Sequence, residues 1–134
     1  LSGDTGFYSM LTFMRKHFKA NELNVMPGIS SVQYMFAKVS SYWNDAFVSS
    51  VHGRNTEYVE KLRECGKIGL LTDKKNTPQR IAEEVVKAGM TEATIYVGEN
   101  LSYESEKIWK MPVKEMMEYE RDFEMNVVLV FLQD

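Results

Sequence analysis

The sequence predicts an α/β fold, in which helices pack on a sheet of five or six strands. Three observations support this prediction. Helical and strand patterns largely alternate along the chain, as they do in layered α/β domains. The nearly continuous apolar run at 68–71 suits a strand buried on both faces, as in a parallel sheet. Glycine-containing corners at 3–6 and 26–31 lead into helical patterns, which is typical of strand-to-helix connections.

The helices are predicted from apolar residues that recur three or four positions apart. A stripe from Phe7 to Phe18 marks the first helix and leaves basic residues facing water. Thr77 is a suitable N-cap, and Pro78 then takes the favoured first position of a helix. Cys65 falls on the apolar face of its helix and is expected to be buried. The predicted helices are 6–19, 30–37, 55–65, 78–88 and 112–120.

The strands are predicted from short apolar runs that lie between turn residues. One such run ends at Pro27 and Gly28, which mark a corner. The segment Asn126–Leu132 is strongly apolar and is expected to be a central strand. The predicted strands are 23–26, 45–51, 67–72, 93–97, 107–111 and 126–132.

Composition and charge narrow the classes of function. The chain has 134 residues, enough for one domain with a core. Its net charge of −3, without a basic run, gives no support for nucleic-acid binding. No apolar run approaches the roughly 18 residues of a membrane-spanning helix and no signal peptide is recognised, so we expect no membrane association. Cys65 is the single cysteine, which excludes an internal disulfide and fits a reducing compartment.

The first residues form a Gly-Asp loop of the kind that normally follows a strand, yet no strand precedes it. We therefore expect the chain to be the C-terminal part of a longer protein, cut at a domain boundary. On that interpretation, half of a binding site lies on the missing part.

The two glycine-rich corners are candidate ligand sites. A tight turn followed by a helix N-terminus leaves backbone N–H groups that can meet an anionic or polar ligand. Ser30 and Ser31 suit the N-terminus of the second helix. Ordinary connections between elements explain the same pattern about equally well, because short glycine motifs are weak signals.

The sequence contains no motif for metal or nucleophilic chemistry. His17 and His52 are the only histidines, and no cluster has the spacing of metal ligands, so no metal site is expected. A nucleophile elbow, a P-loop pattern and a dinucleotide fingerprint are also missing. What remains are polar loops that follow strands, such as the loop with His52 and Arg54. These loops would converge on one crevice of a sheet with parallel strands, so the residues predict an α/β ligand-binding domain with an enzymatic role.

Two of these loops, read together, resemble one family. Ser2–Tyr8 resembles the Ser-Gly-Asp-Pro-Gly-Phe-Tyr segment of the tetrapyrrole (corrin/porphyrin) methyltransferases, with Thr5 in place of the usual proline. Val25–Ser31 resembles their Val-x-Pro-Gly-Ile/Val-Ser/Thr-Ser segment. Within that family, the segments 52–54 and 97–101 look most like the precorrin-6Y (cobalt-precorrin-7) C5-methyltransferase branch.

The resemblance implies a layered α/β/α domain with a mixed five- or six-stranded sheet, the second domain of a tetrapyrrole methylase. It implies that S-adenosyl-L-methionine binds in the cleft between two domains. It also implies an enzyme of cobalamin biosynthesis that methylates C5 of a precorrin. Family members are usually homodimeric and cytoplasmic, and a C15-methylating, decarboxylating domain is a possible fused or separate partner. The isolated fragment would then be inactive.

Family positions map onto this sequence at two sets of residues. The set implied for the cofactor consists of Gly3, Asp4, Gly6, Ser30, Ser31, Leu71, Thr72 and Asn126. Arg54 and His52 are the candidates for the carboxylate-rich substrate. Turn or cap chemistry is the alternative for each cofactor residue.

Two alternatives to this function stay open at this point. One is another tetrapyrrole methylase, such as a uroporphyrinogen methyltransferase or one that acts at a different ring position. The other is a non-catalytic α/β interaction domain.

Overall fold

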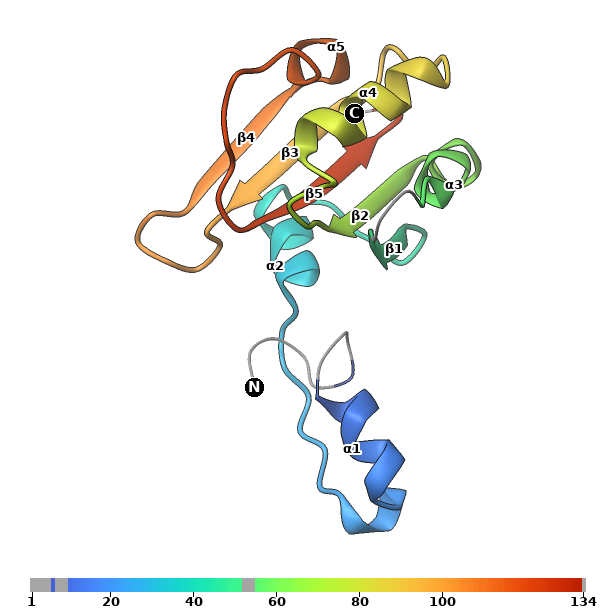
Figure 1. Ribbon diagram of the computed structural model, residues 1–134, viewed down its shortest axis with the longest axis vertical. Coiled ribbons are helices and arrows are strands. Elements are labelled where there is room, and N and C mark those ends of the chain that lie inside the picture. The colour runs from blue at the N-terminus through green and yellow to red at the C-terminus, as the bar shows by residue number, and fades with distance from the viewer. Residues whose placement is uncertain (1–5, 7–9, 52–54, 134) are drawn as a thin grey trace.

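The computed structural model describes residue 6 and residues 10–51 and 55–133. Its centre is a five-stranded sheet with the strand order β1-β2-β5-β3-β4 (Figure 1). β1 runs parallel to β2, whereas β5 is antiparallel to both β2 and β3, and β4 is antiparallel to β3. The predicted α/β fold with a mixed sheet is therefore confirmed. The strands are β1 (Phe47–Ser50), β2 (Lys67–Leu71), β3 (Thr94–Glu99), β4 (Lys107–Pro112) and β5 (Asn126–Phe131).

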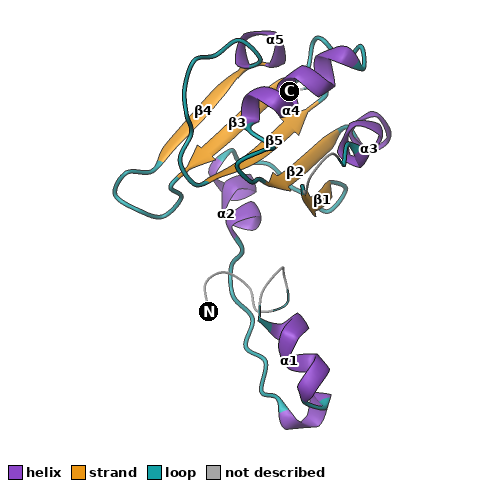
Figure 2. Ribbon diagram, viewed as in Figure 1, coloured by secondary structure: helices purple, strands orange, loops and turns teal. Residues whose placement is uncertain are grey.

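Helices cover both faces of this sheet (Figure 2). α2 packs on one face, against Leu129 and Phe131 of β5. α3, α4 and α5 pack on the other face, against Val128 and Val130 of the same strand. Because successive side chains of a strand point to opposite faces, β5 is buried on both sides, as predicted for a central strand. The helices are α1 (Leu11–His17), the 3-10 helix η1 (Ala20–Glu22), α2 (Ser31–Lys38), α3 (Glu57–Cys65), α4 (Pro78–Lys87) and α5 (Val113–Met116).

Two glycines allow α2 to approach the sheet closely. A Cβ atom on Gly69 would lie 2.9 Å from Cγ1 of Val32 and 3.0 Å from Cε2 of Phe36. A Cβ atom on Gly98 would lie 2.5 Å from Sδ of Met35. A side chain at either position would displace the helix or its side chains, since real Cβ contacts are longer. The two glycines therefore set the distance of α2 from the sheet and the place of its N-terminus.

The two predicted N-caps are confirmed. Oγ of Ser30 accepts a hydrogen bond from the backbone N–H of Gln33 at 3.1 Å, at the start of α2. Oγ1 of Thr77 accepts one from the backbone N–H of Arg80 at 3.2 Å, and Pro78 is the first residue of α4. These bonds satisfy donors that the first helical turn leaves unpaired, so the caps fix where each helix begins.

Helix α1 lies away from the sheet (Figure 1). α1 has no buried residue, and Phe13 is 56% exposed. The predicted helix 6–19 ends earlier in the structure, at His17. Residues 7–9 of the predicted helix lie outside the described part of the chain. The predicted strand 23–26 is wrong. These residues pair with no strand in the part of the chain that the structure describes, so an apolar run here was not sufficient for a strand.

The C-terminal helix is also shorter than predicted. The sequence predicted a helix at 112–120, but α5 ends at Met116. Beyond it, Tyr119 turns back so that its ring centroid lies 5.8 Å from that of Trp109. Packing of these aromatic side chains competes with continuation of the helix. No helix within the described ranges is both long enough and apolar enough to cross a membrane.

Two predictions about α3 and β2 need correction. Cys65 is exposed, because it is the last residue of α3 and Gly66 turns the chain with a φ of 83°. Residues 68–70 are buried, as predicted for a strand covered on both faces, and Leu71 is partly buried, but only one neighbour of β2 is parallel. An antiparallel central strand buried by helices on both faces gives the same apolar pattern as a parallel one.

Candidate functional site

One cavity lies where the ends of three strands meet. β5 runs antiparallel to β2 and β3, so its first residues lie beside the last residues of both neighbours. The first residue of α2 borders the same edge. The cavity has a volume of about 210 Å³, and four of the predicted cofactor residues line it: Ser31, Leu71, Thr72 and Asn126. The structure therefore brings together residues that lie far apart in the sequence.

The other walls of this cavity come from residues that the sequence analysis did not assign to a site. Leu101 and Val127 are apolar wall residues beside Gly98. Tyr103 and Met125 also line the cavity and are 61% and 67% exposed. Their position follows from the pairing of Gly98 with Val127 across β3 and β5, which single-sequence patterns do not reveal. In the structure, the exposed apolar side chains of Tyr103 and Met125 are the feature that points to a binding site here.

Thr72 and Asn126 form the polar edge of the cavity. Oγ1 of Thr72 lies 2.7 Å from Oδ1 of Asn126 and 2.8 Å from its backbone oxygen. The amide Nδ2 of Asn126 donates to the backbone oxygen of Glu124 at 2.8 Å, which directs Oδ1 towards Thr72. The threonine proton is therefore used within the protein, and its oxygen retains lone pairs. The pair offers a ligand one acceptor from Thr72 and one remaining amide hydrogen from Asn126.

A second hollow, of about 390 Å³, contains two further predicted residues, Gly6 and Ser30. Gly28, Trp43 and Val48 also line it. Ser30 and Ser31 are neighbours at the start of α2, so one borders each hollow. The predicted cofactor residues within the described chain thus divide between two hollows at the same helix N-terminus.

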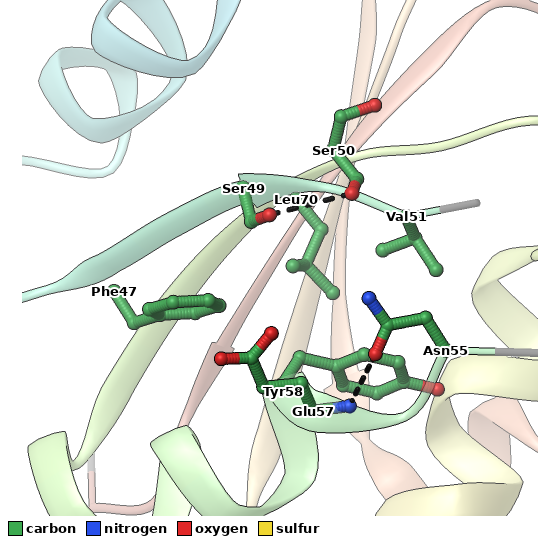
Figure 3. A pocket seen from close by; sticks show the side chains of 8 residues that line it. All are labelled: Phe47, Ser49, Ser50, Val51, Asn55, Glu57, Tyr58 and Leu70. Carbon is green, nitrogen blue, oxygen red and sulfur yellow. Dashed lines mark hydrogen bonds between the residues drawn. The ribbon is translucent and has the colours of Figure 1, made fainter.

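A third hollow lies between β1 and α3 (Figure 3). It measures about 10 Å³, which is room for about one water molecule. The hydroxyl of Tyr58 is buried there without a hydrogen-bond partner among the described residues. Burial and the nearby Glu84 carboxylate raise the pKa of Tyr58 to about 12. This space is too small for an organic ligand.

Four of the predicted site residues lie outside the described part of the chain: Gly3, Asp4, His52 and Arg54. Within the described part, no three histidine, cysteine, aspartate or glutamate side chains gather where a metal ion could be held.

An ion pair between a buried carboxylate and a partly exposed arginine lies next to the first cavity. Glu99 is 1% exposed, and its Oε1 accepts a hydrogen bond from Nη2 of Arg121 at 2.7 Å. Its Oε2 accepts one from the backbone N–H of Glu124 at 2.8 Å. Burial disfavours the charged carboxylate, but these two hydrogen bonds outweigh it and lower the pKa of Glu99. The carboxylate is therefore ionised at neutral pH.

A second polar cluster holds the loop between β3 and β4 against α2. Oε1 of Glu106 accepts hydrogen bonds from the hydroxyl of Tyr34 at 2.6 Å and from the backbone N–H of Ser102 at 2.8 Å. Nζ of Lys38 lies 3.3 Å from its Oε2. The bond from Tyr34 is the main reason that the pKa of Glu106 is lowered. Because Leu101 belongs to this loop, the cluster supports one wall of the cavity.

Comparison with known proteins identifies relatives of this chain. Residues 1–117 match the model of a family described as tetrapyrrole (corrin/porphyrin) methylases. The chain is 36% identical over 129 residues to the cobalt-precorrin-7 C(5)-methyltransferase of Salmonella typhimurium. That match covers 96% of this chain and 62% of the relative, so the chain spans about three fifths of the length of this relative. The resemblance to that branch, predicted from the loops at 52–54 and 97–101, is confirmed.

Solved structures of the same family share the fold. A cobalt precorrin-4 methyltransferase superposes with a TM-score of 0.74 at 18% identity, covering 98% of this chain and 63% of the other. A uroporphyrin-III C-methyltransferase from Thermus thermophilus, complexed with S-adenosyl homocysteine, gives 0.66 at 18% identity and covers 96% and 62%. By sequence and by fold, the chain belongs to the tetrapyrrole (corrin/porphyrin) methylase family.

Proposed function

We propose that this chain is part of an S-adenosyl-L-methionine-dependent methyltransferase that methylates C5 of a precorrin in cobalamin biosynthesis. The observation that carries the proposal is the cavity at the ends of β2, β3 and β5, where Ser31, Leu71, Thr72 and Asn126 gather. The relative from Salmonella typhimurium is named for C5 methylation of cobalt-precorrin-7. The Thermus thermophilus neighbour was solved with S-adenosyl homocysteine.

The residues of the cavity suit S-adenosyl-L-methionine. This molecule has an aromatic base, a ribose and a charged amino acid end, so it needs apolar walls and a few directed polar groups. Leu71, Leu101 and Val127 supply apolar surface. Thr72 and Asn126 supply an acceptor and a donor at the edge. These five residues would hold the adenosine part of the cofactor.

The cofactor, when bound, supplies a methyl group that is activated on a sulfonium. A reduced tetrapyrrole presents an electron-rich carbon, so the work of the protein is to align the two molecules and exclude water. Such a role needs shaped walls, here Leu101 and Val127, rather than a nucleophilic side chain. This agrees with the apolar character of the cavity.

The remaining predicted residues complete the proposal. Gly3, Asp4 and Gly6 would approach the amino acid end of the cofactor, together with Ser30 across the second hollow. His52 and Arg54 would meet carboxylates of the tetrapyrrole, because guanidinium and carboxylate groups pair through two hydrogen bonds.

We extend the proposal to the whole protein. Residues 1–134 would form the C-terminal domain of a two-domain methylase, with the cofactor between the domains. The whole enzyme would be a cytoplasmic homodimer, and a C15-methylating, decarboxylating enzyme would be its fused or separate partner. The relative from Salmonella typhimurium is longer than this chain, which covers 62% of it.

Calorimetric titration of the full-length gene product with S-adenosyl homocysteine tests the cofactor. We expect one site, and we expect Thr72→Val to weaken binding. Thr91→Val is the matched control, because Thr91 does not line the cavity. Absence of binding by the wild-type protein would contradict the proposal and favour a non-catalytic α/β domain.

Product analysis tests the substrate. Incubation with a precorrin and methyl-labelled cofactor, followed by NMR of the product, locates the new methyl group. A label on C5 supports the proposal. A label on another ring carbon would identify a different tetrapyrrole methylase.

A further inference from the structure

Glu99 is a buried carboxylate that does not line the cavity. It is the last residue of β3 and is 1% exposed. Its cross-strand partner is Asn126, the first residue of β5. Residues directly opposite on neighbouring strands point to the same face of a sheet, so Glu99 and Asn126 share a face. A buried charge is therefore placed beside a residue of the proposed cofactor site.

The surroundings of Glu99 are not arranged for maximal stability. The guanidinium carbon of Arg121 lies 4.8 Å from the ring centroid of Trp109 and 5.6 Å from that of Phe123. Nε of Arg121 is buried without an acceptor among the described residues. An unpaired buried donor costs about 1–3 kcal/mol, and an ion pair with a partly exposed arginine adds little net stability. We therefore explain the Glu99–Arg121 ion pair by its effect on the conformation of the chain rather than by its contribution to stability.

The arrangement that it fixes is the segment before β5. Glu99 accepts from Arg121 at 2.7 Å and from the backbone N–H of Glu124 at 2.8 Å, so it holds both ends of 121–124. Asn100 adds a bond from its backbone N–H to the oxygen of Met125 at 2.9 Å. Glu99 and Asn100, at the end of β3, therefore hold residues 121–125 in place before β5 begins.

From this segment the hydrogen bonds continue into the cavity. The backbone oxygen of Glu124 accepts from Nδ2 of Asn126 at 2.8 Å. Oδ1 of Asn126 then lies 2.7 Å from the hydroxyl of Thr72. The bond to Glu124 favours one direction of the asparagine amide, and that direction makes Oδ1 one of the two acceptors that the Thr72 hydroxyl can reach.

We infer that Glu99 is a positioning residue for cofactor binding, acting through Arg121 and the backbone of Glu124 to orient Asn126 and Thr72. The inference rests on the proposed function. Glu99 itself touches neither cofactor nor substrate, so its removal lowers cofactor affinity and leaves the chemical step unchanged.

The test compares Glu99→Gln with Glu92→Gln in the full-length gene product. Glu92 carries a carboxylate that is 87% exposed and serves as the matched control. Glu99→Gln should raise the Kd for S-adenosyl homocysteine and the KM for S-adenosyl-L-methionine by about tenfold, the scale of a lost hydrogen bond to a charged group. The kcat should stay within about twofold, since the chemical step is not altered. Unchanged binding by Glu99→Gln would overturn the inference.

A double-mutant cycle separates positioning from general destabilisation. If Glu99 acts through the asparagine amide, Glu99→Gln should have little effect on the Kd once Asn126→Ala is present. Additive losses would overturn the inference. Should Glu99→Gln fail to fold, Arg121→Lys replaces it in the same cycle, because it keeps the positive charge while changing the bond geometry.

NMR of the unliganded protein separates this inference from the proposed function. The side-chain amide resonances of Asn126 should shift in Glu99→Gln and stay in place in Glu92→Gln. If the wild-type protein binds no cofactor but the Asn126 resonances shift in Glu99→Gln, the proposed function is contradicted and the structural link from Glu99 to Asn126 is supported. Unshifted resonances would refute the link itself.

Discussion

The hydroxyl of Thr72 lies 2.7 Å from the amide oxygen of Asn126, although 54 residues separate them. Thr72 follows the last residue of β2 and Asn126 opens β5. The antiparallel register pairs Leu71 with Val127 and thereby places the next residues opposite each other. The polar edge of the cavity is therefore a product of sheet topology, which motivates the first prediction.

Asn126→Ala should weaken S-adenosyl homocysteine binding by about fivefold, since one net hydrogen bond contributes about 1 kcal/mol. It also leaves the Thr72 hydroxyl with only the backbone oxygen of residue 126 as acceptor. Calorimetry measures the Kd. Asn44→Ala is the control, because Asn44 is exposed and does not line the cavity. Equal affinities of Asn126→Ala and Asn44→Ala for S-adenosyl homocysteine would show that Asn126 does not contribute to cofactor binding.

Gly69→Ala should destabilise the protein by about 1–3 kcal/mol, the usual cost of overpacking a core. The new Cβ would meet Val32 at 2.9 Å and Phe36 at 3.0 Å, so α2 must shift. Urea unfolding gives the free energy, and amide chemical shifts report on α2. Gly89→Ala provides a comparison, because its added Cβ has no neighbour within 4 Å and only its φ of 90° opposes alanine. We expect large changes in the amide chemical shifts of α2 in Gly69→Ala but not in Gly89→Ala.

Stability should fall in acid. The pKa values of Glu99 and Glu106 are lowered from 4.5 in the folded protein. A depressed pKa means that the unfolded chain binds protons first, so the contribution is complete above 4.5 and disappears as pH falls through the lowered values. Urea unfolding between neutral pH and pH 3 measures this loss. Glu99→Gln should flatten the dependence below 4.5, whereas Glu92→Gln should keep the wild-type slope.

Tyr34→Phe should loosen the loop between β3 and β4, because it removes the 2.6 Å hydrogen bond to Glu106. The backbone N–H of Ser102 donates to the same carboxylate and should exchange with solvent several-fold faster, as expected for local opening. Hydrogen exchange followed by NMR measures the rate. Tyr42→Phe is the control, since Tyr42 is 69% exposed and keeps its ring beside Lys67. An unchanged rate at Ser102 would show that Lys38 alone holds Glu106.

Local patterns in the sequence predicted most of the fold. Caps such as Ser30 and Thr77 and apolar runs such as 126–132 depend on neighbouring residues, so they are readable from one chain. The predicted strand at 23–26 was wrong, because this apolar run joins none of the strands that the structure describes. The predicted helix at 112–120 was too long, because Tyr119 packs on Trp109 instead of continuing the helix. The spacing of apolar residues along the sequence does not reveal this contact.

The candidate site was predictable only where it resembled a family. Ser31, Leu71, Thr72 and Asn126 were expected from that resemblance and lie around one cavity. The roles of Glu99 and Arg121 depend on a bond between the end of one strand and a segment 22 residues later. Glu99 lies in the segment 97–101 that resembles the family, but nothing in the sequence marks Arg121 as its partner, so only the structure reveals the pair.

The position of β5 has a consequence for biosynthesis. Among the five strands that the structure describes, β5 comes last along the chain and lies in the middle of the sheet, between β2 and β3. During translation the β1–β2 and β3–β4 pairs emerge first, and each exposes an apolar edge until residues 126–131 leave the ribosome. Such non-local closure is slow and favours aggregation of the nascent chain. A chain truncated before residue 126 would therefore leave the β1–β2 and β3–β4 pairs unjoined.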